Sequence, residues 1–244
     1  MTVNLTRSPH AALAMDGRYR KGRKIERLLE LASDASSRRL LEVGAGSGWI
    51  SHYFAHSSSG QYEVDAVDVV DSRQSKDGYR FTPVEGAALP FADGAFDIVI
   101  SNHVIEHVGD DDEQARHLSE LHRVLRFGGV GYLAAPNRWM LVEPHYRLAF
   151  LSWWPKRWRS AWLRLWRKGS DYDCRPLSCA QLERRLENAG FRFEQLHATA
   201  LQATFEIESP DHPLWRFVLR HVPAGIWSLT RRIFPTLIYH LHKA

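Results

Sequence analysis

The segment LLEVGAGSG, residues 40–48, constrains the fold more than any other part of the sequence. Its short apolar run is typical of a buried strand, and Gly44, Gly46 and Gly48 then lead into a helical pattern that starts near Trp49. Glycine allows a sharp turn and lets a ligand approach the backbone closely. Because the start of a helix also presents unpaired N–H groups, this turn predicts a site for an anionic or polar ligand.

Strand and helix patterns alternate along the rest of the chain. Strands are predicted over residues 62–67, 81–86, 96–101, 128–135, 191–199 and 235–243, and helices over 24–32, 110–126 and 177–190. The first 23 residues are polar and show no clear pattern. Such alternation predicts one α/β domain with a parallel sheet and crossover helices.

Asp68 follows Gly48 by 20 residues, at the end of the strand predicted over 62–67. A carboxylate at this place can accept hydrogen bonds from both hydroxyl groups of a ribose. A glycine turn alone is a weak signal, since it can be only a turn. Together with Asp68 it favours binding of a nucleotide-like ligand.

Four motifs in sequence resemble those of the class I S-adenosylmethionine-dependent methyltransferases. They read LLEVGAGSG, VDAVD, GAALPFADGAFDIVISNHVIEHV and LHRVLRFGGVGYLAAPN, and they span residues 38–137. The spacing of the glycines favours this family over the nicotinamide-dependent dehydrogenases, in which the third glycine usually falls one residue later. The resemblance implies a Rossmann-like, doubly wound sheet of seven strands with an antiparallel last strand, and S-adenosylmethionine as the cofactor.

The resemblance also implies which residues hold the methionine and ribose parts of that cofactor. Glu42 and the backbone of Gly44, Ala45 and Gly46 would surround the methionine part, and Asp68 would hold the ribose hydroxyls. The cofactor carries an ammonium and a sulfonium group, so acidic side chains and carbonyl groups at strand ends suit it.

The remaining implied contacts lie at the ends of two later strands. Glu85, with the backbone of Gly86 and Ala87, would face the adenine, while Ser101 and Asn102 would meet the amino end of the cofactor. Two plainer explanations stay open. Glu85 could be a solvated loop acid, and Asn102 could cap the segment that follows it.

Methyl transfer to a hydroxyl group needs a residue that removes the proton, and histidine can do so near neutral pH. His103 follows Asn102 directly, and Glu143 and His145 lie where this superfamily usually places elements that bind the acceptor. These three residues are the candidates for a general base. His107 is predicted to face outward or to pack against its own helix.

Two insertions depart from the minimal fold, over residues 137–176 and 200–234. The core then comprises residues 24–136, 177–199 and the final strand. The insertions hold eight of the nine tryptophans, and we expect them to form a lid over the carboxyl ends of the strands. A helix starting near Pro155 would align four tryptophans with Ala161 and Leu165, opposite a basic face. The tryptophans are Trp154, Trp158, Trp162 and Trp166, and the cations are Lys156, Arg157, Arg159, Arg164, Arg167 and Lys168.

The tryptophan-rich insertions allow three interpretations. The rings could cover the acceptor pocket or the sheet, or they could lie in the surface of an anionic membrane. Binding of single-stranded nucleic acid is the least favoured, because no separate RNA-binding module is apparent. The hypothesis from sequence is therefore O-methylation of a hydrophobic, lipid-like or lipid-linked acceptor at a membrane. A methyltransferase for a soluble metabolite and a non-catalytic module that retains the fold are the alternatives.

Composition sets the remaining limits. A net charge of +4 is too small to indicate a partner, and no run of about 18 apolar residues predicts a membrane-spanning helix. Cys174 and Cys179 are too few ligands for zinc, so no metal is predicted. The N-terminal residues lack the apolar stretch of a secretory signal. We therefore expect a cytoplasmic protein with reduced thiols that associates peripherally with the membrane.

Overall fold

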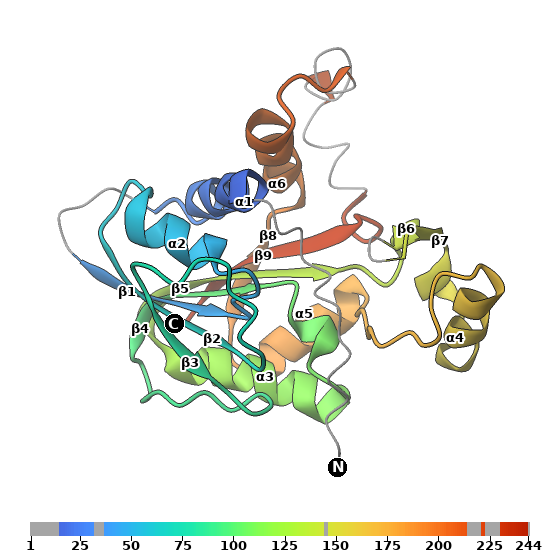
Figure 1. The fold of residues 1–244 in the computed structure, drawn as a ribbon, viewed down its shortest axis with the longest axis horizontal. Coiled ribbons are helices and arrows are strands. Elements are labelled where there is room, and N and C mark those ends of the chain that lie inside the picture. Colours follow the sequence, from blue (N-terminus) through green and yellow to red (C-terminus); the bar gives the residue numbers. More distant parts are fainter. Residues whose placement is uncertain (1–14, 32–36, 144–145, 214–220, 223–229, 244) are drawn as a thin grey trace.

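The structure, a computed structural model, describes residues 15–31, 37–143, 146–213, 221–222 and 230–243 (Figure 1). Its centre is a seven-stranded sheet in the order β3-β2-β1-β4-β5-β9-β8. The strands are β1 (Arg38–Val43), β2 (Tyr62–Asp68), β3 (Arg80–Pro83), β4 (Phe96–Asn102), β5 (Leu125–Pro136), β8 (Arg192–Gln195) and β9 (Thr236–His242). β9 is antiparallel to both of its neighbours. The predicted doubly wound, Rossmann-like α/β sheet is confirmed.

Helices cover both faces of the sheet (Figure 1). α1 (Met15–Leu28), α2 (Trp49–His56) and α6 (His197–Ala203) pack on one face, where Ile25, Phe54 and Ile100 belong to one apolar core. α3 (Asp111–Val124) and α5 (Cys179–Asn188) pack on the other, around Leu118 and Leu182. Because strand side chains alternate between the faces, each inner strand contributes to both cores.

Polar caps fix the starts of the two helices on the second face. The Asp110 side chain accepts a hydrogen bond from the backbone N–H of Glu113 at 3.1 Å, and Ser178 and Gln181 form a reciprocal capping box. These caps satisfy N–H groups that have no partner within the helix. The acidic first turn of α3 adds a favourable interaction with the helix dipole.

Two boundaries differ most from the sequence prediction. α1 begins at Met15 rather than at Lys24. Ion pairs as well as apolar burial hold this helix: Lys21, near its middle, and Arg27, in its last turn, pair with Glu208 and Glu206 of η3 (Thr204–Glu208) at 3.2 and 2.6 Å. Hydrophobic periodicity cannot detect such pairing. The strand predicted over 191–199 ends at Gln195, and its last residues begin α6.

The first insertion forms an extension that we call the arm, comprising the described residues of 137–176. It contains β6 (Val142–Glu143), β7 (Leu148–Ala149), η2 (Leu151–Trp153) and α4 (Lys156–Leu165), with a small apolar core of its own. Figure 1 shows the arm projecting beyond the carboxyl end of β5, well apart from α1 and α6. The lid that the two insertions are predicted to form over the carboxyl ends of the strands stays a prediction. Of the second insertion, Trp215 and Trp227 lie outside the described residues.

Asn137 joins the arm to the core. Its amide group is fully buried, donates to the carbonyl groups of Arg232 and Phe234 at 2.9 and 2.8 Å, and accepts from the backbone N–H of Trp139 at 3.1 Å. These bonds hold the chain leaving β5 against the chain entering β9. An unpaired buried backbone group is costly, so this amide stabilises both connections.

We predict that Asn137→Ala lowers the free energy of unfolding by about 2 to 4 kcal/mol, because two carbonyl groups and one N–H group lose a buried partner. Urea denaturation measures the change. Asn188→Ala, at an exposed position near the end of α5, serves as the control and should change stability by about 0.5 kcal/mol or less. Equal stability of the two variants would contradict the assigned role of Asn137.

Candidate functional site

The site lies where β1 and β4 end side by side. β1 leads through α2 to β2 on one side of this pair, and β4 leads through α3 to β5 on the other. The chain thus diverges at the carboxyl ends of the two strands. Open α/β sheets bind their ligands in the crevice that such a divergence leaves.

The glycine turn and Asp68 meet at this crevice. Gly44 and Gly46 have positive φ angles of 84° and 51°, a region that favours glycine. The backbone N–H of Gly46 donates to Oδ2 of Asp68 at 2.8 Å, and the N–H groups of Gly44 and Ala45 donate to the carbonyl oxygen of Val67. A Cβ atom built on Gly46 would meet open space. The structure therefore brings Gly44, Ala45, Gly46 and Asp68 together around an accessible backbone.

Glu42 is buried directly below the turn. The Ser51 hydroxyl of α2 donates a hydrogen bond to its carboxylate. Burial raises the pKa of Glu42 to about 7, against the opposing effects of that hydrogen bond and of the positive charge of Arg18 on α1. Glu42 therefore changes its charge near neutral pH, which few carboxylates do.

Asn102, at the end of β4, lies on the same face of the sheet as Glu42, since β4 residues Ile98 and Ile100 of that face belong to the α1–α2 core. Its Oδ1 atom is buried and has no hydrogen-bond partner among the described residues. A buried oxygen without a partner is costly unless a ligand or water donates to it. Asn102 therefore fits a ligand that carries an N–H or O–H group.

Ser101 lies on the other face. Its hydroxyl is fully buried and stands 3.1 Å from Nε2 of His117 on α3. Burial lowers the pKa of His117 to about 4, so this histidine is neutral under ordinary conditions. The Ser101 side chain thus belongs to the α3 core and not to the group formed by Glu42 and Asn102.

Glu85, Gly86 and Ala87 follow the end of β3. Glu85 and Gly86 are exposed, whereas Ala87 is buried. Gly86 has a positive φ of 68°, which turns the chain back toward the sheet. These residues lie beyond the end of β3, next to β2 and Asp68, where the sequence analysis expects the adenine contact.

His103 forms part of the wall of a cavity of about 260 Å³. Its φ angle is 59°, unusual for a residue other than glycine, and its backbone N–H donates to the carbonyl of Ala134. Nδ1 of His103 lies 3.3 Å from Oε1 of Glu106, a fully buried carboxylate. This contact orients the ring through Nδ1, so Nε2 is the ring nitrogen that the contact does not use.

The sequence analysis did not identify Glu106. Burial favours its protonated form, but the hydrogen bond and the positive charge of His103 outweigh burial and hold the pKa of Glu106 below its usual value. A buried carboxylate that orients a histidine is the arrangement on which many general bases depend. The signal that could have identified Glu106 was its place three residues after His103, in an otherwise apolar turn.

Charged side chains of α1 and η3 form another wall of the same cavity. Lys24 is buried, pairs with Glu208, and has its Nζ atom 3.0 Å from the hydroxyl of Thr204. Burial and the charge of Lys21 lower the pKa of Lys24 to about 8, although Glu208 opposes this. Two lysines face one carboxylate here, so the wall has a net positive charge.

The other two candidates for a base lie elsewhere. Glu143 is buried inside the arm and accepts a hydrogen bond from the backbone N–H of Tyr146 at 2.8 Å. It belongs to a group around Cys174, whose thiol pKa is raised first by burial and then by Asp173, Glu143 and Glu106. Glu143 does not line the cavity beside His103. His145 lies outside the described residues.

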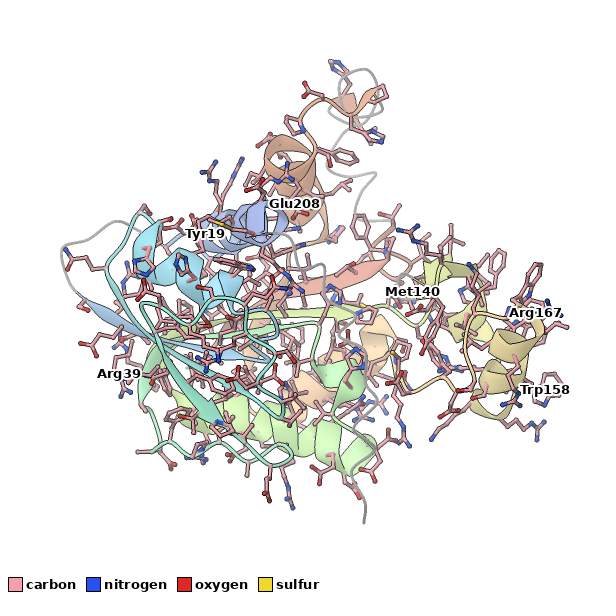
Figure 2. The ribbon with its side chains drawn as sticks, in the orientation of Figure 1. Tyr19, Arg39, Met140, Trp158, Arg167 and Glu208 are labelled. Atoms are coloured by element: carbon pink, nitrogen blue, oxygen red, sulfur yellow. The ribbon has the colours of Figure 1, made fainter. Side chains whose placement is uncertain are left out.

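α4 forms as predicted, but the residues on its buried and exposed faces differ from those that the sequence predicted. The Trp162 ring contacts the rings of both Trp154 and Trp166, and Trp158 packs on Trp154. Trp158 and Trp166 are 49% and 56% exposed, and Figure 2 shows Trp158 pointing away from the sheet. The buried side is formed by Leu163 and, unexpectedly, by Arg159.

Arg159 was predicted to lie on the exposed basic face. Its guanidinium group is instead buried and donates to the carbonyl groups of Trp154 and Ser152, each at 2.9 Å. A guanidinium group with satisfied donors can be buried in this way. Because α4 packs through this residue, Trp158 and Trp166 face solvent, whereas Trp154 and Trp162 are half-buried.

The arm therefore exposes many large apolar side chains: Trp139, Leu141, Val142, Phe150, Trp153, Trp158, Leu165 and Trp166. Exposed cations accompany them: Arg147, Lys156, Arg157, Arg164, Arg167 and Lys168. We call these two sets together the arm surface. Apolar groups exposed at this density usually mark an interaction site. Among the described helices, none is long and apolar enough to cross a membrane.

Known proteins resemble this chain in sequence and in fold. A family model described as a methyltransferase domain matches residues 41–133. A probable S-adenosylmethionine-dependent methyltransferase of Mycolicibacterium smegmatis is 30% identical over 168 residues, which cover 67% of this chain and 56% of the relative. A malonyl-[acyl-carrier protein] O-methyltransferase of Erwinia pyrifoliae is 33% identical over 109 residues, or 43% of this chain and 39% of that protein. The chain thus spans about half the length of these curated relatives or less.

A solved structure shows the same fold over nearly the whole chain. It is a chain of the complex between the Haloferax volcanii Trm112 methyltransferase activator and the putative methyltransferase, with a TM-score of 0.57 and 18% identity. The similarity covers 98% of this chain and 99% of that chain. The matching domain, the related sequences, the strand order and the glycine turn beside Asp68 all agree. The chain therefore belongs to the class I S-adenosylmethionine-dependent methyltransferase superfamily.

Proposed function

We propose that the chain transfers a methyl group from S-adenosylmethionine to an oxygen atom of a hydrophobic or lipid-like acceptor, at the surface of an anionic membrane. The arm surface is the observation that carries this proposal. Its tryptophan rings and exposed cations suit the interface of a bilayer, where indoles lie at the headgroup level and cations meet anionic lipid. We expect the protein to be cytoplasmic and peripheral to the membrane.

The residues at the crevice fit the cofactor. When bound, S-adenosylmethionine supplies a methyl group on a positively charged sulfur. Asp68 would accept the ribose hydroxyls, the backbone of Gly44 to Gly46 would line the methionine part, and Glu85 with the backbone of Gly86 and Ala87 would face the adenine. The unpartnered oxygen of Asn102 would accept from the ammonium group, and Glu42 would supply negative charge nearby.

His103 would act as the general base. It forms part of the cavity wall, and the buried carboxylate of Glu106 holds its Nδ1, so that Nε2 can take a proton from an acceptor hydroxyl. The related malonyl-[acyl-carrier protein] O-methyltransferase supports oxygen as the methylated atom. Glu143 and His145 remain predictions as catalytic residues, and the position of Glu143 inside the arm gives it no contact with the cavity.

A second candidate function is methylation of a soluble, anionic metabolite. The net positive wall formed by Lys21, Lys24 and Glu208 favours it, because a carboxylate or phosphate on the acceptor would find partners there. The arm surface would then have no part in catalysis. Dependence of turnover on membranes distinguishes the two functions.

We predict that cofactor binding strengthens by up to about tenfold between pH 6 and pH 8 through Glu42. With a pKa of about 7, this carboxyl group is mostly protonated at pH 6 and mostly ionised at pH 8, and a cationic ligand prefers the ionised form. Calorimetry across this range measures the effect. Glu42→Gln should show only the pH dependence of the cofactor's own amino group. Identical profiles for both proteins would contradict this role of Glu42.

We predict that His103→Asn lowers the turnover number by about 10²- to 10⁴-fold while the affinity for S-adenosylmethionine changes little. The assay uses radiolabelled S-adenosylmethionine and a long-chain alkyl catechol in phosphatidylglycerol vesicles, and counts label in the organic phase. His107→Asn, in the same turn but not part of the cavity wall, is the control. Full activity of His103→Asn would exclude His103 as the base.

We predict that phosphatidylglycerol vesicles retain the protein in flotation at low salt, and that retention falls as salt rises. Replacing Trp158 and Trp166 with serine should weaken binding by about tenfold or more, because burying a large apolar side chain contributes about 1.5 to 3 kcal/mol. Phe127→Ser, at a still more exposed position outside the arm, should bind normally. If the double variant floats like the wild type, the arm surface is not the membrane contact.

A further inference from the structure

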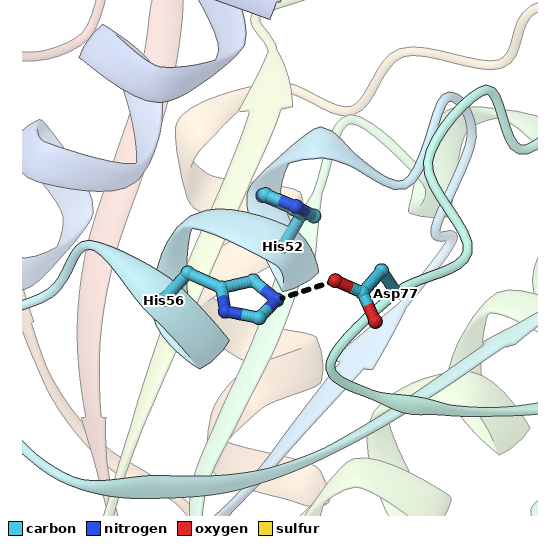
Figure 3. Close-up of side chains that lie close together, drawn as sticks. All are labelled: His52, His56 and Asp77. Carbon is cyan, nitrogen blue, oxygen red and sulfur yellow. Dashed lines mark ion pairs between the residues drawn. The ribbon is translucent and has the colours of Figure 1, made fainter.

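Two histidines and one aspartate form a cluster outside the crevice and the cavity (Figure 3). His52 and His56 lie one turn apart on α2, with ring centroids 4.4 Å apart. Asp77 faces them from the loop between β2 and β3. One ring nitrogen of each histidine and a carboxylate oxygen of Asp77 all lie within 4.8 Å of one another.

The distances suit coordination better than a direct hydrogen bond. Nε2 of His56 and Oδ2 of Asp77 are 3.4 Å apart. A charge-assisted hydrogen bond would bring them to about 2.7 to 2.9 Å. Zinc binds nitrogen and oxygen at about 2.0 to 2.2 Å, so two such ligands at the tetrahedral angle are about 3.3 to 3.5 Å apart. The pair therefore has the separation of two zinc ligands.

The surroundings of both histidines support the same interpretation. The Tyr19 hydroxyl of α1 forms a hydrogen bond with Nδ1 of His52, which leaves Nε2 as the nitrogen for a ligand. A metal-binding histidine usually has its other ring nitrogen fixed in this way. Gly78 has a φ of 80°, and a Cβ atom there would lie 2.2 Å from Nε2 of His56. Glycine at this position lets the loop backbone approach the imidazole.

We propose that His52, His56 and Asp77 bind a zinc ion, with a water molecule in the fourth position. Two imidazoles and one carboxylate form a donor set that zinc accepts, whereas magnesium and calcium prefer oxygen ligands alone. The sequence analysis predicted no metal because it considered the two cysteines. The histidine spacing of four residues on a helix was the signal available for this site.

The ion would fasten the loop that follows Asp68. In the middle of this loop, the backbone N–H of Gln74 donates to the carbonyl of Ser47 at 2.9 Å, and the indole N–H of Trp49 donates to the Gln74 side chain at 3.3 Å. Zinc would add another attachment to α2 through Asp77, three residues later. The loop would then be held at two points beside the glycine turn, which gives the ion a structural role.

Zinc titration of the metal-free, untagged protein tests the proposal. Competition with a chromophoric chelator should show one zinc per chain, and cobalt(II) should give the intense visible absorption of a tetrahedral site. His56→Ala should weaken zinc binding by at least about 100-fold, and Asp77→Asn should weaken it measurably. His212→Ala removes an exposed histidine elsewhere and should bind zinc normally. Magnesium should not compete.

Thermal unfolding gives a second measurement that does not depend on methyl transfer. Zinc should raise the melting temperature of the wild type and of His212→Ala, and leave that of His56→Ala unchanged. His56 and Asp77 are exposed, so the metal-free variants should melt like the metal-free wild type. The proposal is wrong if the wild type binds no zinc at 100-fold excess. It is equally wrong if His56→Ala binds zinc as tightly as the wild type, for example at the group formed by His107, Asp173 and the buried Cys174.

Discussion

In the parallel pair formed by β1 and β4, Val43 faces Ser101, and the two strands end at the same level of the sheet. The closeness of Glu42 and Gly44 to Asn102 depends on this register. The turn after β1 and the segment after β4 come so close that a Cβ atom on Gly44 would lie 2.3 Å from the Val104 side chain. Glycine at this position is therefore required by packing as well as by the turn. A shift of one residue between the two strands would put Glu42 and Asn102 on opposite faces of the sheet.

Two buried carboxylates, on either side of this junction, have opposite electrostatic environments. For Glu42, burial outweighs the hydrogen bonds from Ser51 and the positive charge of Arg18, and its pKa rises to about 7. Glu106 is equally buried but lies beside His103, and its pKa falls. A cationic cofactor would add to the positive charge near Glu42, whereas Glu106 already has its counterpart in His103. The same side-chain type can thus serve as a ligand contact in one place and as a positioning group in another.

Much of the fold and of the cofactor crevice could be predicted from the sequence, because they depend on local signals. Periodicity located the strands, and the glycines with Asp68 located the crevice. What could not be predicted depends on contacts between distant segments. Lys21 and Arg27 of α1 pair with carboxylates of η3, nearly 200 residues away in sequence. Arg159 can be buried because carbonyl groups of the preceding turns accept hydrogen bonds from its guanidinium group. A helical wheel does not show such bonds. Ser101 likewise faces His117 rather than the crevice.

The arm has its own apolar core in Leu148, Leu151 and Leu163, and Asn137 attaches it firmly where β5 ends. A part that is rigid in itself and firmly attached acts as a spacer of fixed length. With the arm surface resting on a bilayer, the crevice would stand at one set height above the lipid. Only an acceptor whose reacting atom reaches that height could be methylated. Selection among acceptors would then depend on the distance between headgroup and reacting atom as much as on the shape of the cavity.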